Sequence, residues 1–199
     1  MTKYKTLIKN NSKSKSNKEK LQEKEERRKK QKMEAILYIT NLPRTTLCMY
    51  TDGCALNNPG SIGAGMYFEF TNSNDDTKKC ISRSASLGHG TNNIAELKGI
   101  ELAFNYLEKE MKDDFSGCSG VEKVVLCTDS LWCVSVIQKI WKCNMNVELV
   151  ESIQQQWNRL KKELKIEIIF YWIPGHCDIK GNEIADELAK NGALNNINS

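Results

Sequence analysis

The sequence predicts an α/β fold, a mixed five-stranded sheet with its first three strands antiparallel, flanked by helices. Three strand-like segments, residues 46–51, 62–70 and 79–85, follow one another across short turns, which indicates an antiparallel meander. Two further apolar strands, residues 121–128 and 166–173, alternate with helical segments, so we expect a mixed sheet.

Four helices are expected around this sheet. Residues 93–111 have the apolar spacing of a helix, a second helix begins at Ser130, and residues 147–164 and 181–191 form the last two. The strand at 166–173 is apolar almost throughout, so we expect it to be buried.

The composition suits one folded domain, which we place at residues 36–195 of the 199-residue chain. Hydrophobic residues make up 40% of the chain and charged residues 27%, enough to form a globular core. No apolar run reaches 18 residues and the first 18 residues are polar and Lys-rich, so we expect neither a membrane span nor a secretory signal.

Residues 1–35 form a basic N-terminal segment. Residues 1–33 hold 13 Lys and Arg against 4 Glu, whereas the rest of the chain holds 16 basic and 21 acidic residues. We expect either a disordered tail or a solvated helix around residues 18–32. A basic arm is typical of nucleic-acid binding, and a merely solubilising tail is the alternative.

The eight cysteines lack a Cys-x-x-Cys pair, which argues against a zinc site. Several lie in apolar runs, so we interpret them as free thiols of an intracellular protein in the nucleus or cytoplasm. The basic run at residues 27–32 could act as a nuclear signal. Mitochondrial targeting is the alternative, although the first 18 residues lack Arg and an apolar face.

Four acids stand where the predicted elements would place a site. One closes the first strand, one lies in the first turn of the first long helix, one closes the fourth strand and one lies in the last helix: Asp52, Glu96, Asp129 and Asp186. Side chains at strand ends reach the edge of an open α/β sheet, where ligands bind.

Each acid also has a structural interpretation. Asp52 could belong to a turn, and Glu96 to a capping box with Asn93. Asp129 could be an N-cap, and Asp186 could form an ion pair with Lys190. For Glu96 that interpretation is weaker, because Glu96 shares a helix face with Ile100 and Leu107. A carboxylate on an apolar stripe needs a reason, and a metal ion supplies one.

Four motifs resemble those of type 1 ribonuclease H, in the order of that family: residues 50–60, 91–97, 127–130 and 172–190. The resemblance spans residues 46–193. It implies the ribonuclease H-like fold and an endonuclease that cuts the RNA strand of an RNA–DNA hybrid, leaving 5′-phosphate and 3′-hydroxyl ends. The short, weakly basic segment at 140–147 is similar to retroelement and reverse-transcriptase-associated versions.

The resemblance also implies a catalytic site of Asp52, Glu96, Asp129 and Asp186, with His176 beside them. The four carboxylates would hold two Mg²⁺ ions, for which Mn²⁺ could substitute, because hard cations prefer oxygen ligands. Asp52 would bridge the two ions, and His176 would have an auxiliary role.

The same resemblance assigns hybrid contacts to Asn58, Thr91, Asn92 and Asn93, which could equally serve turns and caps. Trp132 and Trp141 would stack on the DNA strand or pack in the core. We expect a monomer whose partner is an RNA–DNA hybrid. Asp178 stands where the family usually has Gly, although Asp tolerates unusual backbone angles.

Three other functions remain open at this stage. The chain could be an active ribonuclease H that serves a retroelement, a hybrid-binding module without activity, or an integrase or transposase on the same fold. The presence of all four acids and the histidine argues against a module that only binds, and the motif at 172–190 argues against an integrase.

Overall fold

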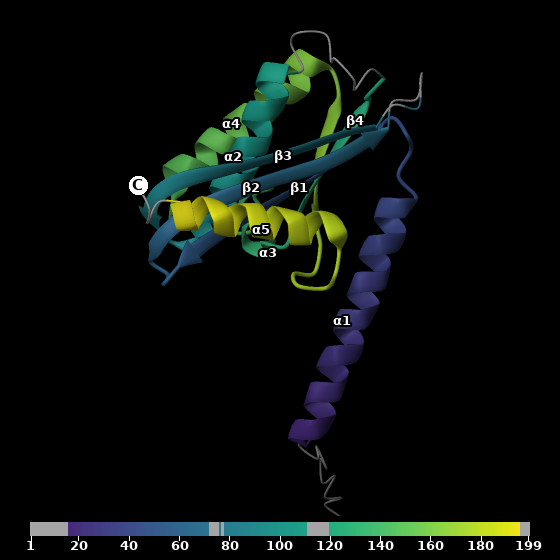
Figure 1. The fold of residues 1–199 in the computed structure, drawn as a ribbon, viewed down its shortest axis with the longest axis vertical. Helices are drawn as coiled ribbons and strands as arrows, with labels where there is room; N and C mark the ends of the chain where they lie inside the picture. The colour runs from purple at the N-terminus through teal and green to yellow at the C-terminus, as the bar shows by residue number, and fades with distance from the viewer. Residues whose placement is uncertain (1–15, 72–75, 77, 111–119, 196–199) are drawn as a thin grey trace, which may run out of the picture.

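The computed structural model describes residues 16–71, 76, 78–110 and 120–195, and its order of elements is shown in Figure 1. Five strands form one sheet in the order β3-β2-β1-β4-β5. The strands are β1 (Thr46–Leu56), β2 (Gly60–Thr71), β3 (Lys78–Gly90), β4 (Lys123–Thr128) and β5 (Glu167–Trp172). The helices are α1 (Asn17–Thr40), α2 (Asn92–Glu110), α3 (Leu131–Ile137), α4 (Val147–Leu164) and α5 (Lys180–Asn195).

The predicted fold class is confirmed. β1, β2 and β3 pair antiparallel, and β4 and β5 run parallel to β1, so the sheet is mixed. The predicted elements are all present, and α4 has the expected bounds. The main difference is β1, which continues through Asp52 and Gly53 to Leu56 instead of turning there.

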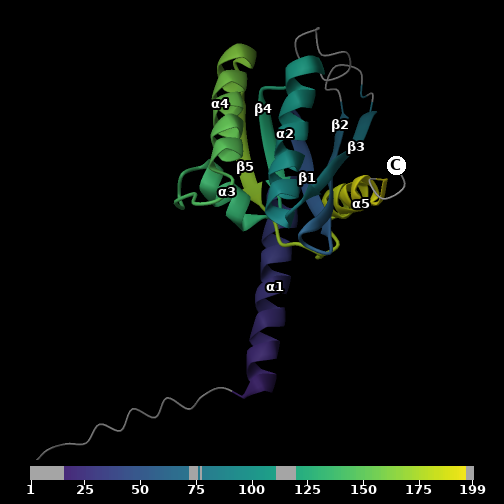
Figure 2. The ribbon, with the colours of Figure 1, turned by 90° about the vertical axis from the view of Figure 1, so that its left-hand side faces the viewer.

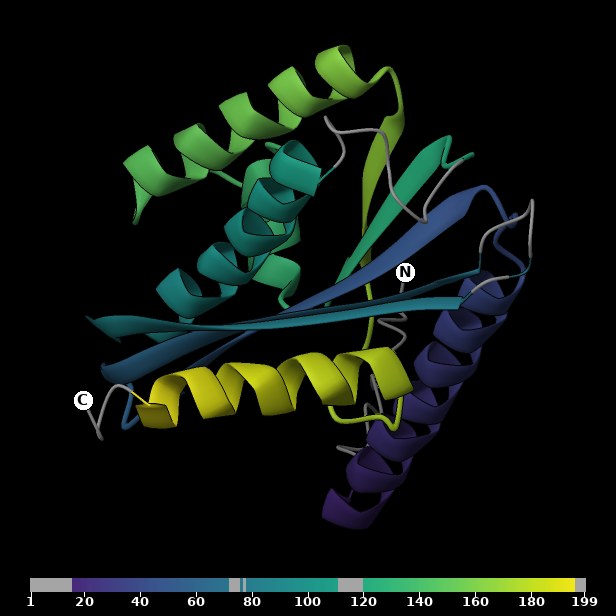
Figure 3. The ribbon, with the colours of Figure 1, turned by 45° about the horizontal axis from the view of Figure 1, so that its top comes forward.

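Helices lie on both faces of the sheet (Figures 2 and 3), and a hydrophobic cluster lies between the sheet and the helices on each face. One face is covered by α2, α3 and α4, and its cluster includes Phe68, Phe104 and Leu126. The other face is covered by α5 and by the C-terminal part of α1. This arrangement follows from alternation along the strands, because successive side chains point to opposite faces of a sheet.

Helix α1 accounts for most of the basic N-terminal segment. It starts with a capping box in which Ser16 accepts from the Glu19 amide and Glu19 accepts from the Ser16 amide. Its last turns pack on the sheet, where Ala35 is buried and Tyr38 stacks on Tyr171 at 3.9 Å between ring centroids. Its first turns project beyond the body of the protein (Figures 1 and 2).

The N-terminal segment is thus helical from Asn17 onward, and the helix crosses the domain boundary that we predict at residue 35. Residues 1–15 lie outside the described part of the chain. Among the described residues, no helix is long and apolar enough to cross a membrane.

Candidate active site

The register of two parallel strands brings Asp52 and Asp129 together. Tyr50 pairs with Cys127 across β1 and β4, so each acid stands two residues beyond a paired position. Asp52 lies on β1 and Asp129 directly follows the end of β4, so the two carboxylates come close together. The Trp172 indole nitrogen donates to the Asp129 carbonyl at 2.9 Å and so ties this strand end to β5.

Glu96 reaches the same place from α2, because Gly53 leaves β1 bare at that point. A Cβ atom on Gly53 would stand 2.0 Å from the Glu96 nitrogen, so only glycine permits this contact. One carboxylate oxygen from each of Asp52, Glu96 and Asp129 lies within 4.8 Å of the other two.

A second group lies beside the first, in the loop before α5 and on α5 itself. His176, Glu183 and Asp186 each place a potential ligand atom within 4.8 Å of the others. Gly175 lets the loop approach Asp129, since a Cβ there would lie 2.3 Å from Asp129 Oδ2. The two groups border one cleft of about 390 Å³, whose lining includes Asp52, Glu96, Asp129, His176, Asp186 and Lys190.

Burial and mutual repulsion disfavour the charged forms of these acids. Burial, and next the charge of Asp129, raise the pKa of Asp52 to about 8. Burial, followed by the charge of Asp52, holds the pKa of Glu96 well above its usual range. Burial also raises the pKa of Asp129, against the opposing effects of the Asn182 amide and His176.

This donor set fits a hard divalent cation. Glu96 is only 6% exposed, and its Oε2 atom is buried without a hydrogen-bond partner. A buried, unpaired carboxylate oxygen among like charges is costly unless a cation or proton compensates it. Carboxylates are the ligands that Mg²⁺ and Mn²⁺ prefer, and Cys54, a thiol that lines the cleft, has its pKa raised by burial.

The structural interpretations of the four acids have mixed outcomes. Asn93 lies inside α2, which begins at Asn92, so it is not the N-cap that a capping box with Glu96 requires. Asp186 does pair with Lys190, as the i,i+4 spacing allows. The N-cap of α3 is Ser130, which accepts from the Cys133 amide, so the Asp129 carboxylate is not used as the cap. Asp52 lies inside a strand and takes part in no turn.

The residues expected to contact a hybrid lie close to this cleft. Asn58, Thr91 and Asn93 line one surface hollow, together with Met145 and Asn146. Asn92 lines the acidic cleft itself, and its backbone amide donates to Asn58 Oδ1 at 3.0 Å. This hydrogen bond agrees with the structural role that we expect for these residues in turns and caps. Their contacts with nucleic acid stay a prediction.

The two predicted tryptophans lie apart from this group. Trp132 is half-buried against the cluster beneath α2, α3 and α4, in agreement with the alternative of core packing. Trp141 is 48% exposed and lines another hollow with Lys139 and Lys142. Stacking of either ring on DNA stays a prediction.

Two residues near the site escaped the sequence interpretation. Glu183 joins the His176 and Asp186 group, and its i,i+3 spacing from Asp186 was the available signal. Asn182 is 1% exposed, donates from Nδ2 to Asp129 Oδ2 at 3.4 Å, and has a buried, unpartnered Oδ1. The residue types Glu and Asn are also common at the start of a helix, so the sequence alone could not distinguish a role in the site from helix capping.

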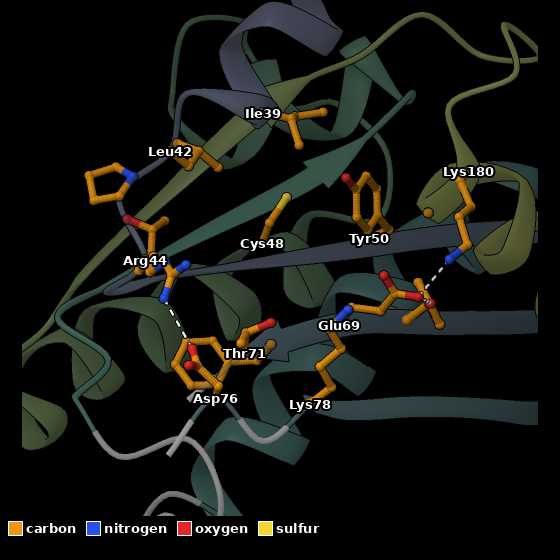
Figure 4. Close-up of a pocket in the computed structure, with 15 residues that line it drawn as sticks. Ile39, Leu42, Arg44, Cys48, Tyr50, Glu69, Thr71, Asp76, Lys78 and Lys180 are labelled. Carbon is orange, nitrogen blue, oxygen red and sulfur yellow. Dashed lines mark hydrogen bonds and ion pairs between the residues drawn. The ribbon is translucent and has the colours of Figure 1, made fainter. Parts of the chain in front are cut away.

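A larger hollow lies between α1 and α5 (Figure 4). Four of its charged side chains form ion pairs, Arg44 with Asp76 and Lys180 with Glu69. The acidic cleft has buried carboxylates without cationic partners, so its chemistry, rather than its size, makes it the candidate active site.

A five-stranded mixed sheet with acids on β1, α2, the end of β4 and α5 defines the class of metal-dependent nucleases with this fold. The family model for RNase H matches residues 44–194, and the chain belongs to the ribonuclease H family. Ribonuclease H of Rickettsia canadensis is 31% identical over 145 residues, which cover 72% of this chain and 86% of that protein. Ribonuclease H of Rickettsia massiliae is 32% identical, with coverages of 72% and 88%.

Solved structures agree on the fold. LC11-RNase H1, isolated from compost by a metagenomic approach, is 25% identical with a TM-score of 0.57, covering 77% of this chain and 99% of its own. The same enzyme in complex with an RNA/DNA hybrid matches at 24% identity and a TM-score of 0.57, with coverages of 76% and 99%. All of α1 precedes the matched family region, because the helix ends at Thr40 and the match begins at residue 44.

Proposed function

We propose that this protein hydrolyses the RNA strand of RNA–DNA hybrids with two divalent metal ions, Mg²⁺ in the first instance, leaving 5′-phosphate and 3′-hydroxyl ends. The observation that carries the proposal is the gathering of Asp52, Glu96 and Asp129 within 4.8 Å, two of them buried, in a chain of the ribonuclease H family.

We assign the ions to four carboxylates, Asp52, Glu96, Asp129 and Asp186. When bound, such ions activate a water molecule and stabilise the leaving oxygen of a phosphodiester. The charges of Asp129 and Asp186 both act on Asp52, which supports the assignment of these three carboxylates to the group that would hold the ions. The raised pKa of Asp52 and Glu96 implies that cation binding displaces protons.

His176 has an auxiliary role in this proposal. One of its ring nitrogens lies within 4.8 Å of carboxylate oxygens of Glu183 and Asp186, and the residue is exposed at the edge of the cleft. An imidazole there can pass a proton to the departing ribose oxygen, whereas the carboxylates are committed to the cations.

Substrate selection is assigned to the polar surface beside the cleft. The amides of Asn58 and Asn93 and the hydroxyl of Thr91 offer donors and acceptors in one hollow. The 2′-hydroxyl groups in a wide, shallow minor groove are the feature that distinguishes RNA from DNA at such a surface.

A cleavage assay tests the proposal. Labelled RNA–DNA hybrid, duplex RNA and duplex DNA are incubated with and without Mg²⁺, and the products are tested for extension from a free 3′-hydroxyl. We expect cleavage of the hybrid alone, dependent on the cation. Equal cutting of duplex RNA, or near-normal turnover by a folded Asp52→Asn variant, would overturn it.

A further inference from the structure

One face of α1 connects the sheet to the loop that holds His176. Arg28, Lys32, Ala35 and Ile39 recur at i, i+4, i+7 and i+11, a spacing that places them in one row along a helix. Ala35 and Ile39 belong to the cluster on the sheet, so the apolar end of the row is fixed. Its basic end is therefore held at a defined place beside the loop.

The two basic residues contact the loop on both sides of the histidine. Arg28 Nη2 donates to the Gly175 carbonyl oxygen at 2.9 Å and lies 3.8 Å from Cys177 Sγ. Lys32 Nζ forms an ion pair with Asp178 Oδ2 at 2.9 Å. His176 lies between these attachment points in the sequence.

The backbone of this loop is of a kind that needs support. His176 has φ 49° and Asp178 has φ 53°, both in the left-handed region, which residues with a Cβ adopt at a cost of about 1 kcal/mol each. The ends of the loop are fixed, because Ile173 and Ile179 are buried in the same cluster as Ala35. Between those ends, α1 supplies side-chain contacts at Gly175, Cys177 and Asp178.

We propose that Arg28 and Lys32 are positioning residues, which hold the loop so that His176 faces Glu183 and Asp186. This inference rests on the proposed role of His176 in hydrolysis. The residues need not touch the substrate: they act through the loop, from a helix that precedes the matched family region.

The strength of these contacts determines which measurements they should affect. The Asp178 side chain is 92% exposed, and exposed ion pairs contribute little to global stability. Local loop opening needs far less free energy than global unfolding, so weak contacts can still set the loop population. We therefore expect an effect on the loop and on kcat, with little change in the unfolding midpoint.

A simple electrostatic role for α1 is the competing explanation. In that case any basic residue of the helix would attract the phosphates of the substrate equally. Lys29 and Lys30 are adjacent on the helix and exposed, and Lys30 pairs within α1 with Glu34 at 3.8 Å. The double variant Lys29→Ala/Lys30→Ala removes the same charge as Arg28→Ala/Lys32→Ala and is the matched control.

The first measurement is hydrogen exchange of a peptide spanning residues 173–179 in the metal-free protein. We expect faster exchange in Arg28→Ala/Lys32→Ala and an unchanged rate in the control. The second measurement is kcat at saturating hybrid, which should fall about three- to ten-fold in Arg28→Ala/Lys32→Ala. This loss is smaller than the rate loss of about 10²-fold that misplacement of a reacting group can cause. A change confined to KM, or equal effects in both variants, would overturn the inference.

A double-mutant cycle with His176→Ala completes the test. If Arg28 and Lys32 act through His176, their replacement should lower kcat no further once His176 is alanine. Additive losses would overturn the positioning role. If His176→Ala leaves kcat intact, the proposed role of the histidine fails instead, and the exchange rates still report whether α1 holds the loop.

Discussion

A Cβ atom on Gly53 would stand 2.0 Å from the backbone nitrogen of Glu96 and 2.1 Å from the Ala95 carbonyl carbon. β1 and α2 therefore touch at the point where their acids meet. We predict that Gly53→Ala pushes the helix away and costs at least the about 1–3 kcal/mol typical of overpacking, because backbone atoms cannot rotate aside. Chemical denaturation measures the loss, and an unchanged midpoint would show that β1 and α2 separate freely.

Removal of single carboxylates should separate activity from folding. We predict that Asp52→Asn and Glu96→Gln lower hybrid cleavage by about two or more orders of magnitude, because each removes an anionic ligand from the cation site. His176→Ala should be milder, since the carboxylates still hold the cations. Steady-state kinetics measure the losses, with circular dichroism as the control for folding. A folded Glu96→Gln variant with normal turnover would contradict the assignment.

The raised pKa of the acids predicts how stability varies with pH without metal. The pKa of Asp52 is about 8 when folded and about 4 when unfolded, so the folded state binds the proton more tightly. Its contribution to stability is present below about pH 4 and is lost as the pH rises through 8. We expect the unfolding free energy to fall across that window by about 1 kcal/mol or more, the value of one pKa unit.

Urea unfolding at pH 5 and at pH 8 in EDTA measures this loss. Asp52→Asn should flatten the dependence, and Mg²⁺ should restore stability at pH 8, because the ligand binds only the folded site. An equal or steeper pH dependence of stability in Asp52→Asn would contradict the assignment of this dependence to Asp52.

The proposed contacts of Asn58 and Asn92 with the hybrid predict that the enzyme requires several consecutive ribonucleotides. The hollow lined by Asn58, Thr91 and Asn93 lies beside the acidic cleft, so it would meet sugars away from the scissile bond. A duplex DNA with one embedded ribonucleotide should be cut poorly compared with a matched duplex that contains a run of four. Equal rates on the two duplexes would remove these residues from substrate selection.

More of the fold than of the detailed contacts around the site could be predicted from the sequence. The order of strands and helices along the chain follows from periodicity, and the site of four acids follows from local motifs that resemble those of type 1 ribonuclease H. The Asp52-Gly53 sequence predicts the end of β1, because Asp-Gly usually indicates a turn. Packing against α2 keeps the strand extended there, and that tertiary contact cannot be read from local residues.

The contacts of α1 with the loop before α5 could not be predicted from the sequence either. Arg28 and Gly175 are separated by 147 residues, and a run of Lys, Arg and Glu has no pattern that names its partner. Glu183 was missed for a related reason, since acids in the first turn of a helix are ordinarily explained by its dipole. Asp178 agrees with expectation, because it adopts the positive φ that its replacement of glycine requires.

The remaining prediction concerns residues 1–15, which hold five lysines and no acid. Because α1 packs on the body and contacts the His176 loop, deletion of residues 1–33 would mix two effects, and deletion of residues 1–15 isolates the charge. Each phosphate contact adds a log–log salt slope of about −0.9 for duplex DNA. We predict that the shorter deletion raises KM and flattens the salt dependence, with kcat at saturation unchanged, since these lysines are not assigned to the reacting centre. Hybrid affinity of both proteins between roughly 50 and 200 mM salt measures the slopes. Identical slopes would mean that the five lysines make no contact with the substrate.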